Sequence, residues 1–259
     1  MVSEEFSKVL IFDLMGPLAH FRKFYTNSSS LTYSFPPRTV VSGLIAGMLG
    51  YQRDSYYEKL GLENCKIGVS VQKRVRKLME TVNYISTKDF SFKKILKGEI
   101  ERTQVPLEIL MPVDSKTLRF RIFFWNKNEE IYSDLKRRLK EKAFVYPPYL
   151  GLTEFIAEVD FVCEGEVHGP LQLEKHVTIK SVTDKKCISE LMISSDIARM
   201  YYTEKAPVAF KENREILKSA TYIFEATNNL EAKVREGAIY QITYQEKGSS
   251  KKEYIAFME

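Results

Sequence analysis

Residues 16–50 have the sequence GPLAHFRKFYTNSSSLTYSFPPRTVVSGLIAGMLG, and this stretch decides the fold of the first half of the chain. Its second part predicts a helix, because Pro36 and Pro37 preset φ for a first helical turn. Apolar side chains then recur with the helical period up to Gly50. That glycine suits the left-handed backbone that ends many helices. The stretch therefore predicts a polar loop followed directly by a helix.

The polar loop combines cations, aromatic rings and hydroxyl groups. It contains His20, Arg22, Lys23, Tyr25 and Tyr33, together with a run of serines. Loops that connect buried elements frequently carry function. We expect this loop to contact a polyanion, and RNA is the favoured class.

Two glycines, Gly43 and Gly47, lie four residues apart within the predicted helix. Each glycine costs a helix about 1 kcal/mol relative to alanine, so a compensating reason is expected. We predict that the missing side chains allow the helix to pack closely on a sheet.

The quoted stretch lies in an alternating series of strands and helices. A buried strand is expected before it at 8–15, and Gly16 with Pro17 ends that strand because proline cannot donate to a sheet. After it we expect a short helical connection at 51–64, strands at 65–72, 118–125 and 155–163, and a helix at 129–143. Elements in this order form the ferredoxin-like pattern. We predict an α+β, ferredoxin-like (RRM-like) domain over residues 1–164.

Residues 73–117 form an insertion between the second and third of these strands. From Lys73 to Arg102, nine basic residues stand against four acidic ones. Aromatic residues are spread through the same segment, and two prolines near its end favour extended structure. A ferredoxin-like sheet is a common platform for single-stranded RNA, since bases stack on aromatic rings while cations follow the phosphates. We expect the loop and the insertion to frame one groove.

Residues 165–259 predict a smaller, mostly β unit. Short alternating runs occur at 175–182, 220–226 and 238–244. A hairpin is expected near the end of the chain, with Gly248 at its turn.

The composition favours a cytoplasmic setting and excludes several classes of site. The formal net charge of +5 is a mild bias. The three cysteines are far apart and form no CxxC, so neither a disulfide framework nor a zinc site is predicted. No apolar run approaches the ~18 residues of a membrane helix, and no cofactor or hydrolase motif is present.

Other functions remain open on the residues alone. The basic insertion is also compatible with a solvated surface over core aromatic rings, or with a scaffold that meets an acidic protein. A metal-independent ribonuclease needs a general base near a 2′-hydroxyl, and His20 with Tyr25 or Lys23 could serve.

Three stretches carry a resemblance to a known family. The run 16–50, followed by YQRDSYYEKLG, looks like the N-terminal signature of the Cas-five family of CRISPR-associated proteins, within the RAMP superfamily and particularly its type I-B-like members. RTQVPLEILMPV at 102–113 and PPYLGLTEF at 147–155 are similar to two further stretches of that family.

The resemblance implies an RNA-binding subunit of the Cascade surveillance complex, which acts in antiviral defence. It implies a ferredoxin-like domain whose thumb is the insertion 73–117, and a smaller C-terminal β domain at 165–259. The implied partners are the 5′ handle of the guide RNA, the neighbouring backbone subunit and the large subunit, with target DNA reached indirectly through the complex. The implied RNA-binding residues are His20, Arg22, Lys23, Tyr25, Tyr33, Arg38, Lys73, Arg74, Arg76, Lys77, Arg102 and Gln104.

The chain departs from the branch of this family that cleaves precursor guide RNA. Members of that branch, from type I-C systems, are implied to use a tyrosine in the first helix region and a lysine–histidine pair on the thumb side. Here the segment 43–49 contains no tyrosine, and no histidine occurs between His20 and His168. We therefore expect a non-catalytic protein without a cofactor, with a metal-independent endoribonuclease as the alternative.

Overall fold

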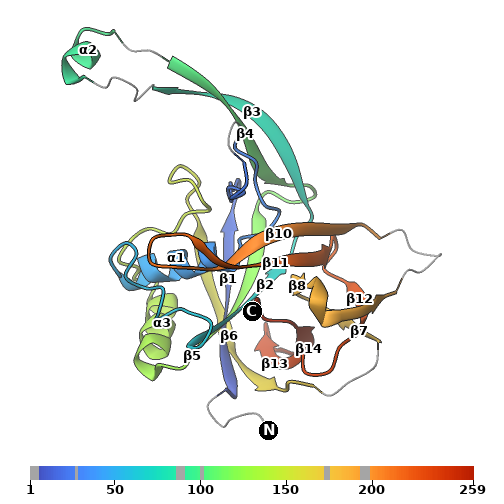
Figure 1. The fold of residues 1–259 in the computed structure, drawn as a ribbon. Helices are drawn as coiled ribbons and strands as arrows, with labels where there is room; N and C mark the ends of the chain where they lie inside the picture. The colour runs from blue at the N-terminus through green and yellow to red at the C-terminus, as the bar shows by residue number, and fades with distance from the viewer. Residues whose placement is uncertain (1–5, 27–28, 86–90, 100–101, 172–175, 193–198) are drawn as a thin grey trace.

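The computed structural model of the chain describes residues 6–26, 29–85, 91–99, 102–171, 176–192 and 199–259. It is a mixed α+β fold in which strands predominate (Figure 1). In the described part of the chain, nine strands form one sheet in the order β2-β5-β1-β6-β13-β14-β7-β12-β9. A three-stranded sheet (β10-β11-β8) and a separate hairpin (β3-β4) complete the strands.

The described part of the first half supplies one end of the large sheet, two helices of 12 and 13 residues and a short helix of five. Strand β1 lies between β5 and β6 and pairs antiparallel with both. The side chains of Leu10, Phe12 and Leu14 are fully buried on the face that α1 and α3 cover. The elements are β1 (Lys8–Gly16), α1 (Arg38–Leu49), β2 (Cys65–Val71), β3 (Val75–Ile85), α2 (Phe92–Leu96), β4 (Arg102–Pro112), β5 (Leu118–Asn126), α3 (Glu129–Glu141) and β6 (Glu158–His168).

Most predicted elements of this half are confirmed, and one is wrong. Residues 51–64 form a series of turns and no helix, and Asp54 adopts a left-handed φ of 65° that a right-handed helix does not accept. The predicted strand at 155–163 begins later, at Glu158. Gly50 ends α1 with a φ of 82°, as expected, and its N–H contacts the last turn of the helix.

The insertion folds as a long hairpin that stands away from the rest of the molecule in Figure 1. Strands β3 and β4 pair in register from Val75 with Pro112 to Ile85 with Arg102. The extended structure expected at 102–113 is confirmed. We call this unit, β3 and β4 together, the thumb hairpin.

The second half of the chain is almost entirely β. Strand β13 pairs with β6, so the large sheet runs across residue 164, and the division into two domains at this point stays a prediction. The expected hairpin is confirmed: Lys247 and Gly248 both have positive φ, as a tight two-residue turn requires. The elements are β7 (His176–Ile179), β8 (Thr183–Asp184), a 3-10 turn (Lys185–Cys187), β9 (Ile188–Leu191), β10 (Tyr201–Phe210), β11 (Ile216–Glu225), β12 (Leu230–Val234), β13 (Tyr240–Glu246) and β14 (Ser249–Ile255).

The large sheet curls back onto itself. The backbone N–H groups of Val182 and Met258 donate to the carbonyls of Val69 and Ile67 on β2, at 2.7 and 2.8 Å. The free edge of β2 is thereby covered by segments that follow β7 and β14. Side chains of β13 and β14 also pack on the sheet face opposite the helices, in a cluster that includes Ile11.

Candidate nucleic-acid interface

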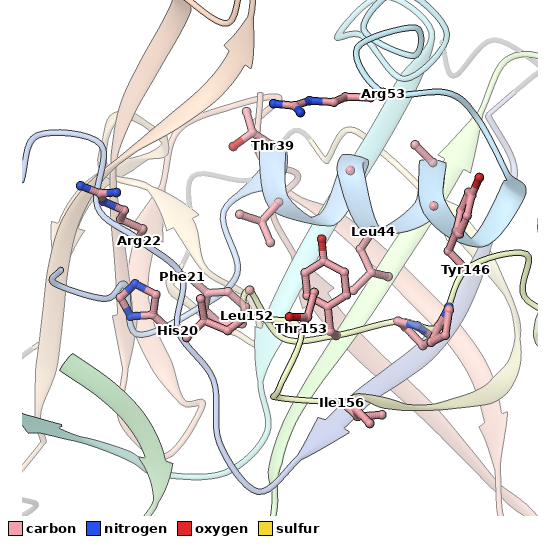
Figure 2. Close-up of a pocket in the computed structure, with 18 of the residues that line it drawn as sticks. His20, Phe21, Arg22, Thr39, Leu44, Arg53, Tyr146, Leu152, Thr153 and Ile156 are labelled. Atoms are coloured by element: carbon pink, nitrogen blue, oxygen red, sulfur yellow. The ribbon is translucent and has the colours of Figure 1, made fainter. Parts of the chain in front are cut away.

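A cavity of about 1340 Å³ lies where four segments of the first half meet (Figure 2). Its walls come from the loop after β1, the first helix with the turns behind it, the thumb hairpin, and the loop at 146–156. We call it the groove. It opens on the helix side of the sheet. The opposite face of the sheet is packed against β13 and β14.

One face of α1 forms the bottom of the groove. Thr39, Val40, Gly43, Leu44 and Gly47 line it, and all five are only partly buried. We call these five residues the glycine face of α1. The opposite side of the helix packs into the core and is buried.

The two helix glycines therefore face the groove, and the predicted packing of these glycines on a sheet is wrong. A Cβ atom added at Gly47 would meet nothing within 4 Å. A Cβ atom added at Gly43 would lie 3.1 Å from the Tyr56 hydroxyl, which is a side-chain contact from the turns after α1. The helix is apolar on both sides, so its periodicity does not reveal which side contacts the sheet.

The polar character of the groove is cationic. Arg22 and Arg53 line it, and the described residues on its walls include no aspartate or glutamate. Aromatic rings form much of the remaining surface, and prolines and small residues complete it. The tyrosines on its walls are Tyr51, Tyr56, Tyr84, Tyr146 and Tyr149.

His20 lies at the edge of the groove with both ring nitrogens in hydrogen bonds. Its Nδ1–H donates to the Glu108 carbonyl at 2.8 Å, and its Nε2 accepts from the Ser30 hydroxyl at 3.3 Å. Burial lowers the pKa of this imidazole below its usual value, so the neutral form is favoured at pH 7. The ring therefore joins the loop to β4 of the thumb hairpin.

Two of the lysines predicted to bind RNA contact a carboxylate instead. Glu204 on β10 accepts from Lys77 Nζ at 2.7 Å and lies 3.3 Å from Lys23 Nζ. The same carboxylate accepts from the backbone N–H of Ser34 at 2.8 Å. Burial alone raises the pKa of Glu204, but the two lysines and the Ser34 hydrogen bond lower it below the usual value. The lysines are therefore already paired in this structure.

Tyr33 and Arg38 lie in the core, and their positions give no support to the predicted RNA contacts. The Tyr33 side chain is 1% exposed, and its hydroxyl donates to the Lys205 carbonyl at 2.9 Å. Arg38 is 2% exposed and binds four backbone carbonyls, among them that of Cys65 at 2.8 Å. Burial lowers the pKa of this guanidinium from its usual value.

Of the twelve predicted residues, the structure brings His20 and Arg22 to the groove. Tyr25 does not line the groove; it is half exposed, with Lys23 Nζ 5.9 Å from its ring centroid. Arg74 lies 3.4 Å from Asp114. The predicted residues that are exposed on the thumb hairpin or just before it, outside the groove, are Lys73, Arg74, Arg76, Arg102 and Gln104.

Several groove residues were not predicted as site residues. Gln52 and Arg53 come from the segment 51–64, which was interpreted as a connecting helix. Tyr146 and Tyr149 flank two prolines in the loop before β6. Clusters of tyrosine with proline or arginine in such loops are the feature that could have identified them.

The described part of the chain holds no group of three or more His, Cys, Asp or Glu that could bind a metal ion. Among the described residues, no helix is long and apolar enough to cross a membrane.

The fold and the groove together define an α+β protein with a cationic cavity lined by aromatic rings. The chain belongs to the family described as "CRISPR-associated protein (Cas_Cas5)", whose model matches residues 9–197. The resemblance seen in the sequence is thereby confirmed at the level of the family. No curated protein matches the chain in sequence.

Solved structures of CRISPR proteins are similar to this chain. A "CRISPR protein from Archaeoglobus fulgidus" aligns with a TM-score of 0.51 and 14% identity, over 95% of this chain and 99% of that one. A chain of a "CRISPR RNA-guided surveillance complex" aligns with a TM-score of 0.45 and 14% identity, over 88% and 92%. A chain of the "Type III-B Cmr-beta bound to cognate target RNA and AMPPnP" aligns with a TM-score of 0.47 and 10% identity, over 86% of this chain and 86% of that one. The first of these shows a shared fold.

Proposed function

We propose that this protein is a non-catalytic RNA-binding subunit of a type I CRISPR Cascade complex, of the I-B-like kind, and that it holds the 5′ handle of the guide RNA. The observation that carries the proposal is the groove, whose described walls combine two arginines and five tyrosines and include no carboxylate. Membership of the CRISPR-associated family supports it.

The chemistry of the groove suits a single-stranded RNA better than a duplex or an acidic protein. Arginine side chains bind phosphates, and aromatic rings stack on unpaired bases with about 1–3 kcal/mol per base. An acidic protein would use the cations and leave the apolar tyrosine rings in water. The groove also lies between the polar loop after β1 and the thumb hairpin, which are the two segments whose sequences are rich in basic residues.

The arrangement of the first half supports a ferredoxin-like domain as the platform. The strands β2, β5, β1 and β6 are adjacent in that order, and α1 and α3 cover one face of them. Strand β6 is the last strand of the pattern in sequence and lies beside the first, with a crossover helix before it. Target DNA would then be recognised by pairing with the guide, while this chain contacts the guide and its neighbouring backbone and large subunits.

The surroundings of His20 support a binding role over cleavage. A general base needs a free nitrogen near the 2′-hydroxyl that it deprotonates, and both ring nitrogens of His20 are already in hydrogen bonds. Burial also raises the pKa of the Tyr56 hydroxyl, so a smaller fraction of this group is in the phenolate form that could act as a base.

Binding of a fluorescent single-stranded repeat RNA, measured by anisotropy at several salt concentrations in EDTA, tests the function. We expect the logarithm of the binding constant to fall linearly with the logarithm of the salt concentration. The RNA should remain intact after incubation. A matched RNA duplex is the control and should bind less tightly. No binding at low salt would remove the proposal. A discrete cut that is lost in His20→Ala would replace it with the endoribonuclease alternative.

A further inference from the structure

We propose that the glycine face of α1 receives one unstacked base of the bound RNA, which lies flat on the helix backbone at Gly47 beside the ring of Tyr146. This inference rests on the proposed function and names the part of the groove that holds a base. It assigns to Gly47 a role in binding.

The first step is the open space above the helix. Gly47 is in the last turn of a regular helix, where glycine is a poor helix former. Its φ is not left-handed, and a Cβ atom there would contact nothing within 4 Å. Neither backbone conformation nor packing within the chain therefore explains this glycine. A flat ligand that approaches the backbone does explain it.

The second step is the apolar border of that space. Leu44 and Val40 precede Gly47 by one and two turns on the same face and line the groove with it. Figure 2 shows Leu44 projecting from the helix toward the cavity. Aliphatic side chains beside a bare backbone patch form a surface on which a planar ring fits better than a branched group.

The third step is the aromatic wall. The N–H of Tyr146 donates to the Gly47 carbonyl at 3.3 Å, and that of Val145 donates to the Met48 carbonyl at 3.1 Å. These bonds hold the loop against the end of α1, and Figure 2 shows Tyr146 beside that end. The Tyr146 side chain is 58% exposed, so its ring is available for stacking.

The fourth step is charge and edge chemistry. Arg22 and Arg53 line the groove together with the glycine face, and in Figure 2 both lie towards the Thr39 end of α1, where they can bind phosphates of the same RNA strand. Thr39, Thr153 and Gln52 supply donors and acceptors for the polar edges of a base. With no carboxylate on the described walls, an anionic chain with planar rings is the class of ligand that these residues fit.

The decisive variant is Gly47→Leu, which fills the space with a side chain that helices accept. We expect its affinity for the repeat RNA to fall about tenfold, the loss of one stacked base. Its salt dependence should stay that of the native protein, because phosphate contacts remain. Its melting temperature should rise by about 2 °C, since leucine is the better helix former. Ser133→Leu, on the exposed side of α3, is the matched control and should keep native affinity.

An abasic scan of the RNA identifies the base and separates the possible failures. At one position, removal of the base should weaken binding to the native protein about tenfold and have no further effect on Gly47→Leu. Tyr146→Ala should weaken binding in the same way, and Tyr146→Phe should keep it. Native binding with no effect of Gly47→Leu would overturn this inference alone. If the losses of affinity caused by Gly47→Leu and by base removal were additive at every position, the leucine would act by a general distortion of the groove. That result would also overturn this inference.

Discussion

Lys77 on the thumb hairpin and Glu204 on β10 form a salt bridge with Nζ and Oε1 2.7 Å apart. The two residues come from different halves of the chain, and the Glu204 side chain is only 8% exposed. The same carboxylate contacts Lys23 and the backbone of Ser34. The base of the thumb hairpin, the polar loop and β10 are therefore joined at one buried charge.

Replacing this charge should destabilise the fold. In Glu204→Gln, Lys77 and Lys23 lose their counter-ion, and we expect the free energy of unfolding to fall by about 1–3 kcal/mol at pH 7. Urea unfolding measures it. Glu215→Gln, in an exposed pair with Lys211, is the control and should change stability by less than about 0.5 kcal/mol. Equal effects of both variants would contradict the prediction.

The stabilisation by Glu246 should depend on pH. Hydrogen bonds from Arg121 lower the pKa of the Glu246 carboxyl from 4.5 to about 2, with burial opposing the shift and Lys251 adding to it. A carboxyl with a lowered pKa in the folded state stabilises the fold above its unfolded pKa. We expect the native protein to be more stable than Glu246→Gln above pH 4.5, and we expect this difference in stability to disappear as the pH falls from 4.5 towards 2. Thermal unfolding across that range tests it, and a constant difference would refute it.

Arg38 should act in folding and not in RNA binding. Its guanidinium binds four backbone carbonyls from three segments, and its Nε has no partner among the described residues. In Arg38→Met those carbonyls lose their donors, and we expect the free energy of unfolding to fall by about 3 kcal/mol or more. Chemical unfolding measures the change. RNA affinity of the folded fraction should remain native, and a selective loss of affinity would show that Arg38 reaches the ligand.

Arg22 should contribute one phosphate contact. It is exposed, lines the groove and makes one weak contact, from its Nη2 to the Thr26 carbonyl at 3.3 Å. In Arg22→Ala we expect the slope of log K against log salt to decrease by about 0.7. Arg235→Ala, at an exposed turn far along the sheet, removes the same charge and should leave the slope unchanged. Anisotropy titrations at four salt concentrations are sufficient, and equal slopes in the two variants would exclude the contact.

The elements of the first half were predictable because their determinants are local. Prolines, a closing glycine and apolar periodicity specify α1, and a nearly continuous run of large apolar residues specifies β1. The prediction of a helix at 51–64 was wrong because one left-handed residue, Asp54, interrupts a pattern that otherwise suits a helix.

The site was less predictable because its determinants are distant in sequence. Lys23 and Lys77 look like free cations until the fold brings Glu204 to them. The periodicity of α1 fits either side of the helix, so the exposure of Gly47 needed the tertiary structure. Charge and residue type thus indicated the region of the groove, and the fold decided which side chains in it are available.

The backbone bond between Met258 and Ile67 has a consequence for synthesis on the ribosome. Strand β2 emerges early, but the groups that cover its outer edge follow only after β7 and β14 have been made. Until then β2, which pairs with β5 on one side, keeps an unpaired outer edge, and this is the kind of edge that recruits other chains. The folding of the first half is thereby tied to the completion of the second, and a chain released early would aggregate through β2.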